Sequence, residues 1–161
     1  MRRVVICEDH EIVYTGLRLL LEESVHYELA GHVKKGRELI PLLQKLRPDI
    51  LILDLNLPDT DGFTLLRSIR EFDNTLLVVI LTMYQDEVLL DRAREEGANA
   101  YLLKNASNED LLKALSIVSI GSFYVTAELD AELLKKKLFH DTFTQKMKLT
   151  RREVEIIRML S

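Results

Sequence analysis

"ILILDLNLPDTDGF", residues 50–63, runs four apolar residues straight into an aspartate, Asp54, and then into a turn rich in Asp, Pro and Gly. A continuous apolar run of this length is typical of a strand that is covered on both faces. An ionised carboxylate is costly to bury unless a cation pairs with it or it performs chemistry. The stretch therefore predicts a buried strand that ends in a carboxylate with a partner or a chemical role.

Four other apolar runs share this strand character, and segments with helical spacing lie between the five. The predicted strands cover residues 4–7, 27–33, 50–54, 76–82 and 100–104. The predicted helices cover residues 11–23, 36–46, 61–72, 85–96 and 107–119. Because each return to a parallel neighbour needs a crossover, strict alternation of strand and helix implies a parallel sheet. The sequence predicts an α/β fold with a doubly wound five-stranded parallel sheet, followed by a helical linker and a further helical segment.

The composition is that of an ordinary globular protein, with 161 residues, 47% hydrophobic and 30% charged. Its longest apolar runs have the length of strands, which is too short for a membrane span, and the N-terminus turns acidic too soon to hold a signal-peptide core. The single cysteine, Cys7, permits no internal disulfide, which favours a reducing cytoplasm. The net charge of -4 is uneven, since residues 1–122 are acidic and residues 123–161 mildly basic. We expect a cytoplasmic protein without a membrane segment.

Polar side chains end four of the five predicted strands. They are Glu8 and Asp9 after the first strand, Asp54 on the third, Thr82 on the fourth and Lys104 on the fifth. In a doubly wound sheet, ligands bind outside the carboxyl ends of the strands, where the strand order reverses. We therefore expect these side chains to gather at one edge of the sheet.

The expected cluster indicates phosphoryl chemistry. Three carboxylates at one edge would repel each other without a cation, and an all-oxygen site suits a hard divalent ion such as Mg2+. Mg2+ keeps several waters and shares phosphate oxygens, so the site predicts a phosphoryl ligand. Lys104 would supply a cation for that group, and Thr82 a hydroxyl donor. Asp54 would be the nucleophile, because a carboxylate can attack phosphorus and form an aspartyl phosphate.

In order and spacing, these motifs resemble the receiver domains of bacterial two-component response regulators. The resemblance covers about residues 3–120 and rests on the acidic pair, "LDLNLPDTDGF", "LT" after the fourth strand and "YLLK" on the fifth. It implies a flavodoxin-like receiver in which a histidine kinase or a small phosphodonor phosphorylates Asp54. It also implies that Asp9, Asp54 and the main-chain carbonyl of Asn56 bind Mg2+ directly, while Glu8 contributes mostly through water.

The resemblance further implies that the protein acts in signalling and is not an enzyme, apart from its own phosphorylation and dephosphorylation. Thr82 and Tyr101 would rearrange on phosphorylation and alter a helical surface, so that the protein forms a homodimer. Many receivers carry a proline and a cis bond after the lysine of the fifth strand, whereas Asn105 follows Lys104 here. His10 is interpreted as a loop histidine at the rim of the site.

The residues after the receiver show two further helical patterns. Residues 123–148 are interpreted as a linker with a helix at about 127–140. "LTRREVEIIRMLS", residues 149–161, begins with a capping-box pattern and resembles the opening helix of the LuxR-type helix-turn-helix domain. In that family the recognition helix comes later. We therefore expect a receiver at 1–122, the linker, and the first helix of a truncated output domain of a NarL/FixJ-like regulator, which would bind DNA only through the missing C-terminal part.

Two other functions remain open. A phosphatase of the haloacid-dehalogenase type also uses a strand-end aspartate and Mg2+, but it needs a second aspartate two residues later, where this chain has Asn56. A pseudo-receiver would keep the fold as a binding module without phosphorylation. The intact set of Asp54, Thr82 and Lys104 argues against the second alternative.

Overall fold

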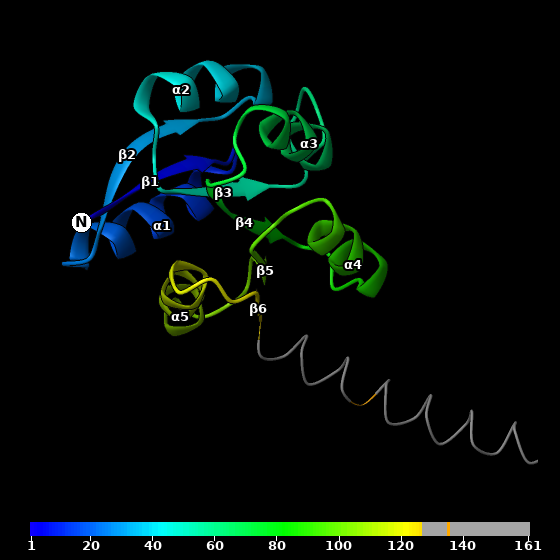
Figure 1. The fold of residues 1–161 in the computed structure, drawn as a ribbon. Helices are drawn as coiled ribbons and strands as arrows, with labels where there is room; N and C mark the ends of the chain where they lie inside the picture. Colours follow the sequence, from blue (N-terminus) through cyan, green and yellow to red (C-terminus); the bar gives the residue numbers. More distant parts are fainter. Residues whose placement is uncertain (127–134, 136–161) are drawn as a thin grey trace, which may run out of the picture. The chain divides into compact units, whose positions relative to one another are not determined.

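The computed structural model describes residues 1–126 and Lys135, and within them six parallel strands form one sheet with helices on both faces (Figure 1). The strands are β1 (Arg2–Cys7), β2 (Tyr27–Val33), β3 (Ile50–Asp54), β4 (Leu77–Thr82), β5 (Ala100–Leu103) and β6 (Tyr124–Val125). The helices are α1 (Glu11–Glu23), the 3-10 turn η1 (Gly36–Glu38), α2 (Leu39–Leu46), α3 (Gly62–Phe72), α4 (Glu87–Glu95) and α5 (Asn108–Ser119). In this part of the chain no helix is long and apolar enough to cross a membrane.

The strand order, β2-β1-β3-β4-β5-β6, confirms the predicted doubly wound parallel sheet. The chain runs outward from β1 to β2, then returns past β1 to β3 and continues in the other direction. The order of the strands therefore reverses between β1 and β3, and a ligand site is expected outside their carboxyl ends. The residues that follow these two strands are neighbours at that edge.

The sheet has one strand more than the five that the sequence predicts. The additional strand, β6, is two residues long and pairs with β5 in parallel. The chain reaches it through a turn at Gly121, whose φ of 86° favours glycine. Thr126 follows β6, is fully buried, and accepts a hydrogen bond of 3.0 Å from the Leu103 amide. Two residues are too few for a periodic pattern, which is why the strand was not predicted.

The helices bury their apolar faces against the two sides of the sheet. α1 and α5 cover one side, and α2, α3 and α4 cover the other (Figure 1). Leu20 and Leu21 of α1 join Leu111 and Leu115 of α5 in one cluster with strand side chains. Such double coverage requires strands that are apolar throughout, and β3 is buried at every position, including Asp54. The polar residues that end the strands therefore lie at the edge of a closed core.

The predicted helices and the other predicted strands lie within a few residues of the observed ones. β5 ends at Leu103, so Lys104 is the first residue after the strand. The predicted helix over 36–46 begins as the 3-10 turn η1 and continues as α2. The helices expected at about 127–140 and in 149–161 lie outside the described residues.

Candidate functional site

The loop between β3 and α3 uses two other aspartates for its structure. Asp59 accepts hydrogen bonds from the amides of Gly36 at 2.8 Å and Arg37 at 2.9 Å, and the bond from Arg37 lowers the pKa of Asp59. These bonds tie the loop to the turn after β2. Asp61 is the N-cap of α3 and accepts a hydrogen bond from an amide of the first helical turn. Asp54 is therefore not needed to cap the helix or to anchor the loop.

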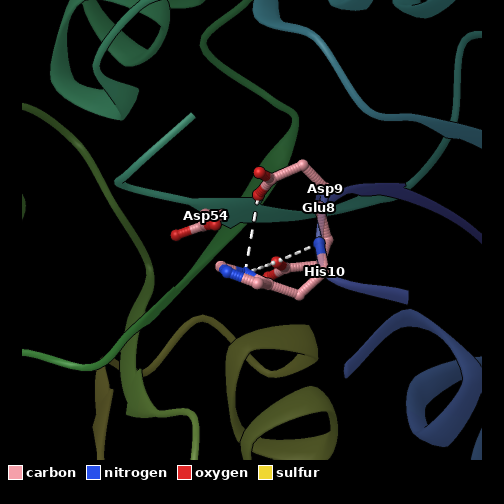
Figure 2. A group of neighbouring side chains, drawn as sticks. All are labelled: Glu8, Asp9, His10 and Asp54. Atoms are coloured by element: carbon pink, nitrogen blue, oxygen red, sulfur yellow. Dashed lines mark hydrogen bonds and ion pairs between the residues drawn. The ribbon is translucent and has the colours of Figure 1, made fainter. Parts of the chain in front are cut away.

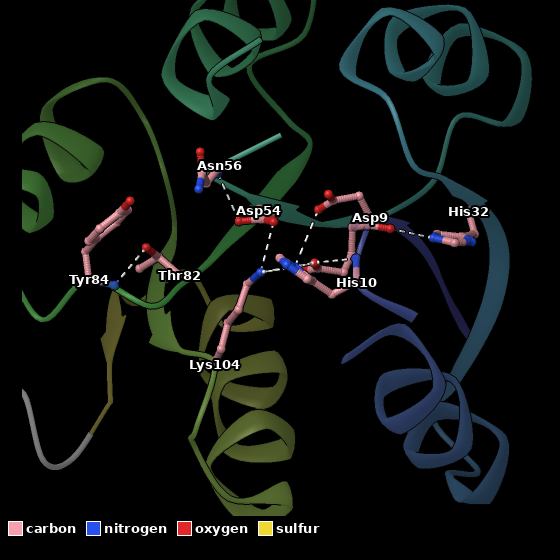
Figure 3. A network of polar contacts seen from close by, with 9 residues as sticks. Asp9, His10, His32, Asp54, Asn56, Thr82, Tyr84 and Lys104 are labelled. Carbon is pink, nitrogen blue, oxygen red and sulfur yellow. Dashed lines mark hydrogen bonds and ion pairs between the residues drawn. The ribbon is translucent and has the colours of Figure 1, made fainter. Parts of the chain in front are cut away.

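Asp54 ends β3 with a side chain that is only 1% exposed. Its Oδ1 accepts a hydrogen bond of 2.9 Å from the Asn56 amide, and its Oδ2 accepts one of 3.0 Å from the Lys104 ammonium (Figure 3). Burial raises the pKa of Asp54 to about 6, although the hydrogen bonds from Asn56 and Lys104 oppose the rise. The result is a carboxylate that is more basic than usual and is held in a fixed orientation.

Lys104 connects Asp54 with Glu8, which follows β1. Its Nζ lies 3.0 Å from Glu8 Oε1 as well as 3.0 Å from Asp54 Oδ2. Burial alone would lower the pKa of Lys104, but its hydrogen bonds with Asp54 and Glu8 raise it. The ammonium is thus fixed at the edge of the sheet, where it can pair with an anion attached to Asp54.

Glu8, Asp9, His10 and Asp54 form an acidic cluster at the carboxyl ends of β1 and β3 (Figure 2). One potential ligand atom of each lies within 4.8 Å of the others. Among the described residues, Glu8 Oε2 and Asp9 Oδ1 are buried and have no hydrogen-bond partner. Buried carboxylate oxygens without partners are costly, and a set of such oxygens fits the coordination that Mg2+ prefers. The structure therefore contains the acidic cluster predicted from the strand ends.

Thr82 and Tyr101 lie on the neighbouring strands β4 and β5. Asp54 is opposite Leu81 in the register of the sheet, so Thr82 lies one residue further along β4. The Thr82 hydroxyl oxygen accepts a hydrogen bond of 3.1 Å from the Tyr84 amide. Tyr101 is fully buried and donates a hydrogen bond of 2.6 Å to the Tyr84 carbonyl, while burial raises its pKa to about 12. Both side chains therefore hold the same residue of the segment after β4.

The structure adds His10 to the predicted group. His10 precedes α1, and its Nδ1 lies 2.9 Å from Glu8 Oε1 and 3.1 Å from Lys104 Nζ. Its position directly after the acidic pair in "CEDH" was the available signal, but the sequence pattern does not show where the ring points. The bond between Lys104 and Asn105 is trans, because the described residues contain no cis peptide bond.

Comparison with known proteins identifies the family. Residues 4–116 match the response regulator receiver domain. The chain is 31% identical over 156 residues to the transcriptional regulatory protein YdfI of Bacillus subtilis, and the matched region covers 97% of this chain and 70% of that protein. It is 29% identical over 160 residues to the nitrate/nitrite response regulator protein NarL of Escherichia coli, and the matched region covers 98% of this chain and 74% of that protein.

Solved structures show the same similarity. A two-component response regulator of the LuxR family from Aurantimonas sp. superposes with a TM-score of 0.80 at 28% identity, over 86% of this chain and 99% of that one. The isolated receiver domain of RcsB from Salmonella enterica, determined with the phosphomimetic BeF3-, superposes with a TM-score of 0.75 at 29% identity, over 81% and 96% of the two chains. The chain belongs to the response regulator receiver domain family, among regulators of the LuxR and NarL type, and its acidic pocket fits the phosphorylation site of such a domain.

Proposed function

We propose that Asp54 is the phosphoacceptor of this receiver and that a sensor histidine kinase is the phosphodonor. The observation that carries this proposal is the position of Lys104, whose Nζ lies 3.0 Å from both Asp54 Oδ2 and Glu8 Oε1. The buried ammonium of Lys104 thus joins the carboxylate of Asp54, whose pKa is raised, to the carboxylate of Glu8 after β1. The similarity to receivers named as response regulators supports the same assignment.

The transfer is a displacement at phosphorus. A carboxylate oxygen of Asp54 attacks the phosphorus of a phosphohistidine on the kinase and forms an O–P bond. The P–N bond breaks, and its electron pair leaves with the imidazole, which takes up a proton. Lys104 pairs with the phosphoryl oxygens, and the Thr82 hydroxyl donates a hydrogen bond to one of them. A small phosphodonor replaces the kinase because the groups that accept and stabilise the phosphoryl group all come from the receiver.

Mg2+ fits the cluster as the accompanying ion. Asp9, Asp54 and the main-chain carbonyl of Asn56 would hold it, with Glu8 contributing mostly through water. When bound, the ion supplies positive charge against the carboxylates and the phosphoryl oxygens. Two buried oxygens, Glu8 Oε2 and Asp9 Oδ1, have no hydrogen-bond partner in the part of the chain that the structure describes, and they support this assignment because a cation would interact with both.

The signal passes through the segment after β4. Once the Thr82 hydroxyl turns to the phosphoryl group, it releases the Tyr84 amide that it binds at 3.1 Å. The Tyr84 carbonyl holds Tyr101 by a hydrogen bond of 2.6 Å, so the same movement alters the environment of β5. This movement changes a helical surface of the receiver, through which two chains form a homodimer. DNA binding then follows through an output part that begins within residues 149–161. In support, one similar structure, 29% identical and with 66% of its length covered, is described as two RcsB dimers bound to two DNAs.

Incubation with acetyl phosphate and Mg2+, followed by intact mass spectrometry, tests the proposal. The wild-type chain should gain one phosphoryl group, and Asp54→Asn should gain none. Asp91→Asn, which removes an exposed carboxylate of α4, is the matched control and should be labelled like the wild type. Chelation of Mg2+ with EDTA should abolish the labelling. Undiminished labelling of Asp54→Asn would refute the proposal.

A further inference from the structure

His10 occupies a helix N-terminus without capping it. Its backbone is that of the N-cap of α1, with φ −80° and ψ 114°, but its side chain makes no hydrogen bond to the helix. By contrast, α3, α4 and α5 are capped by side chains that accept from first-turn amides, namely Asp61, Asp86 and Ser107. Such short oxygen-bearing side chains are the ones that stabilise a helix start. At α1 this stabilisation is absent, and the ring points to the acidic cluster instead (Figure 2).

The His10 Nδ1 atom faces charges of both signs. It lies 2.9 Å from Glu8 Oε1, 3.5 Å from Asp9 Oδ1 and 3.1 Å from Lys104 Nζ. One ring nitrogen cannot donate to the carboxylates and accept from the ammonium at the same time. A divalent cation would resolve this conflict, because the lone pair of Nδ1 and the carboxylate oxygens could all be directed to it.

A second observation points to a ligand at the same place. The side chain of Glu8 is 1% exposed, and its Oε2 has no hydrogen-bond partner among the described residues. The ligand atoms of Glu8, Asp9, His10 and Asp54 lie within 4.8 Å of one another. In an octahedral site with bonds of about 2.1 Å, neighbouring ligands are about 3.0 Å apart and opposite ones about 4.2 Å. Asp9, His10 and Asp54 therefore need only small adjustments to meet one ion, with Glu8 close enough to contribute through water.

The donor set decides which ion is favoured. Carboxylates, carbonyls and water suit Mg2+, whereas imidazole suits iron, nickel and zinc, and affinities for nitrogen ligands rise from manganese through cobalt to copper. We propose that His10 is a direct ligand of the cation beside Asp54 and that it makes this receiver prefer a divalent transition metal ion to Mg2+. The inference rests on the proposed function, since it concerns the same site. Mg2+ still binds through the oxygen ligands, but it gains little from the imidazole.

Calorimetric titration of the full 161-residue chain with Co2+ and, separately, with Mg2+ tests the preference. His10→Ala should weaken Co2+ binding by about tenfold or more while changing Mg2+ binding by less than about twofold. His10→Asp should shift the preference toward Mg2+, because an oxygen ligand replaces the nitrogen. His26→Ala removes an exposed histidine outside the cluster and should behave like the wild type.

The paramagnetism of Co2+ provides a second measurement. In proton NMR spectra, the ring protons of a coordinated His10 should shift far outside the normal range, and these signals should be absent from His10→Ala. An equal ratio of Co2+ to Mg2+ affinity in wild type and His10→Ala would overturn the inference. The proposed function would survive that result if Asp9→Ala loses both metals. If the wild-type chain binds neither ion, or if Asp9→Ala binds both ions as well as the wild type does, the inference and the proposed Mg2+ site are overturned together.

Discussion

The ammonium of Lys104 lies 3.0 Å from Oδ2 of Asp54, and the two side chains are only 5% and 1% exposed. Removing Lys104 would leave the buried charges of Asp54 and Glu8 without their cation, whereas the ammonium still pairs with Glu8 when Asp54 loses its charge. Lys104 also contacts Glu8, so this single residue after β5 is linked to the ends of β1 and β3. A change of charge at Asp54 therefore acts directly on the segment that leads from β5 to α5.

Lys104→Ala should separate phosphorylation from dimerisation. Asp54 remains in place as the nucleophile, so the variant should still be labelled by acetyl phosphate, although more slowly. Without the ammonium, the phosphoryl charge has no cation through which to act on β5. Sedimentation velocity should show phosphorylation strengthening the wild-type dimer by about tenfold or more, and that of the variant by less than about twofold.

Lys113→Ala is the matched control, because Lys113 is an exposed lysine of α5. Its dimerisation should depend on phosphorylation as the wild type's does. The same phosphorylation-dependent dimerisation in Lys104→Ala would reject the role of the lysine in signalling.

Asp54 should make the stability of the protein fall as the pH rises. Its pKa is about 6 in the folded chain against an ordinary value of 3.8, so the native state holds the proton more tightly than the unfolded state does. The resulting stabilisation is present below about pH 4 and is lost as the pH rises through about 6. Asp54→Asn avoids this loss. With EDTA present at pH 7.5, the variant should be more stable than the wild type by about 1–3 kcal/mol.

Urea denaturation at several pH values between 5 and 7.5 would measure this difference. The advantage of Asp54→Asn should shrink as the pH is lowered, because protonation then relieves the wild type as well. A variant that is less stable than the wild type at pH 7.5, or a difference that grows toward pH 5, would contradict the raised pKa of Asp54.

Two glycines should respond to alanine in opposite ways. A Cβ at Gly62, the first residue of α3, would lie 2.7 Å from Leu55 Cα and 2.8 Å from the Asp54 carbonyl oxygen. Because both are backbone atoms, the loop beside Asp54 would have to shift. Gly62→Ala should cost about 1–3 kcal/mol of stability and slow the labelling of Asp54. At Gly16, inside α1, a Cβ would meet nothing within 4 Å, so Gly16→Ala should add about 0.5–1 kcal/mol.

Urea denaturation followed by far-UV circular dichroism would compare the two variants with the wild type. Two results would contradict this prediction: stabilisation by Gly62→Ala, or a loss of stability in Gly16→Ala as large as that expected for Gly62→Ala. Either would show that close approach of the backbone does not determine the effect of alanine on stability at these positions.

The gathering of the site residues was predictable because it depends on topology. Parallel strands place their carboxyl ends at one edge, so polar residues after β1, β3, β4 and β5 had to become neighbours. A helix N-cap in the loop after β3 could also be expected, since helix capping follows local sequence rules, and Asp61 does cap α3. These features require only hydrophobic periodicity and short-range chemistry.

Other features depend on packing between distant parts of the chain, which the sequence pattern does not contain. The orientation of the His10 ring and the choice of Glu8 Oε1 as the acceptor for Lys104 arise from contacts across 94 and 96 residues. The hydrogen bond from Tyr101 to the Tyr84 carbonyl needs the observed path of the segment after β4. The two-residue strand β6 forms only because the edge of β5 is available to it.

Chemical identification of the phosphorylated residue is the most direct measurement. Borohydride reduces an aspartyl phosphate to homoserine, so the phosphorylated chain would be reduced, digested and analysed by peptide mass spectrometry. We predict homoserine at position 54 in the wild type, unmodified aspartate at Asp9, Asp59 and Asp61, and no homoserine in Asp54→Asn. Homoserine at another aspartate, with Asp54 unmodified in the same phosphorylated sample, would contradict the assignment of Asp54 as the phosphoacceptor.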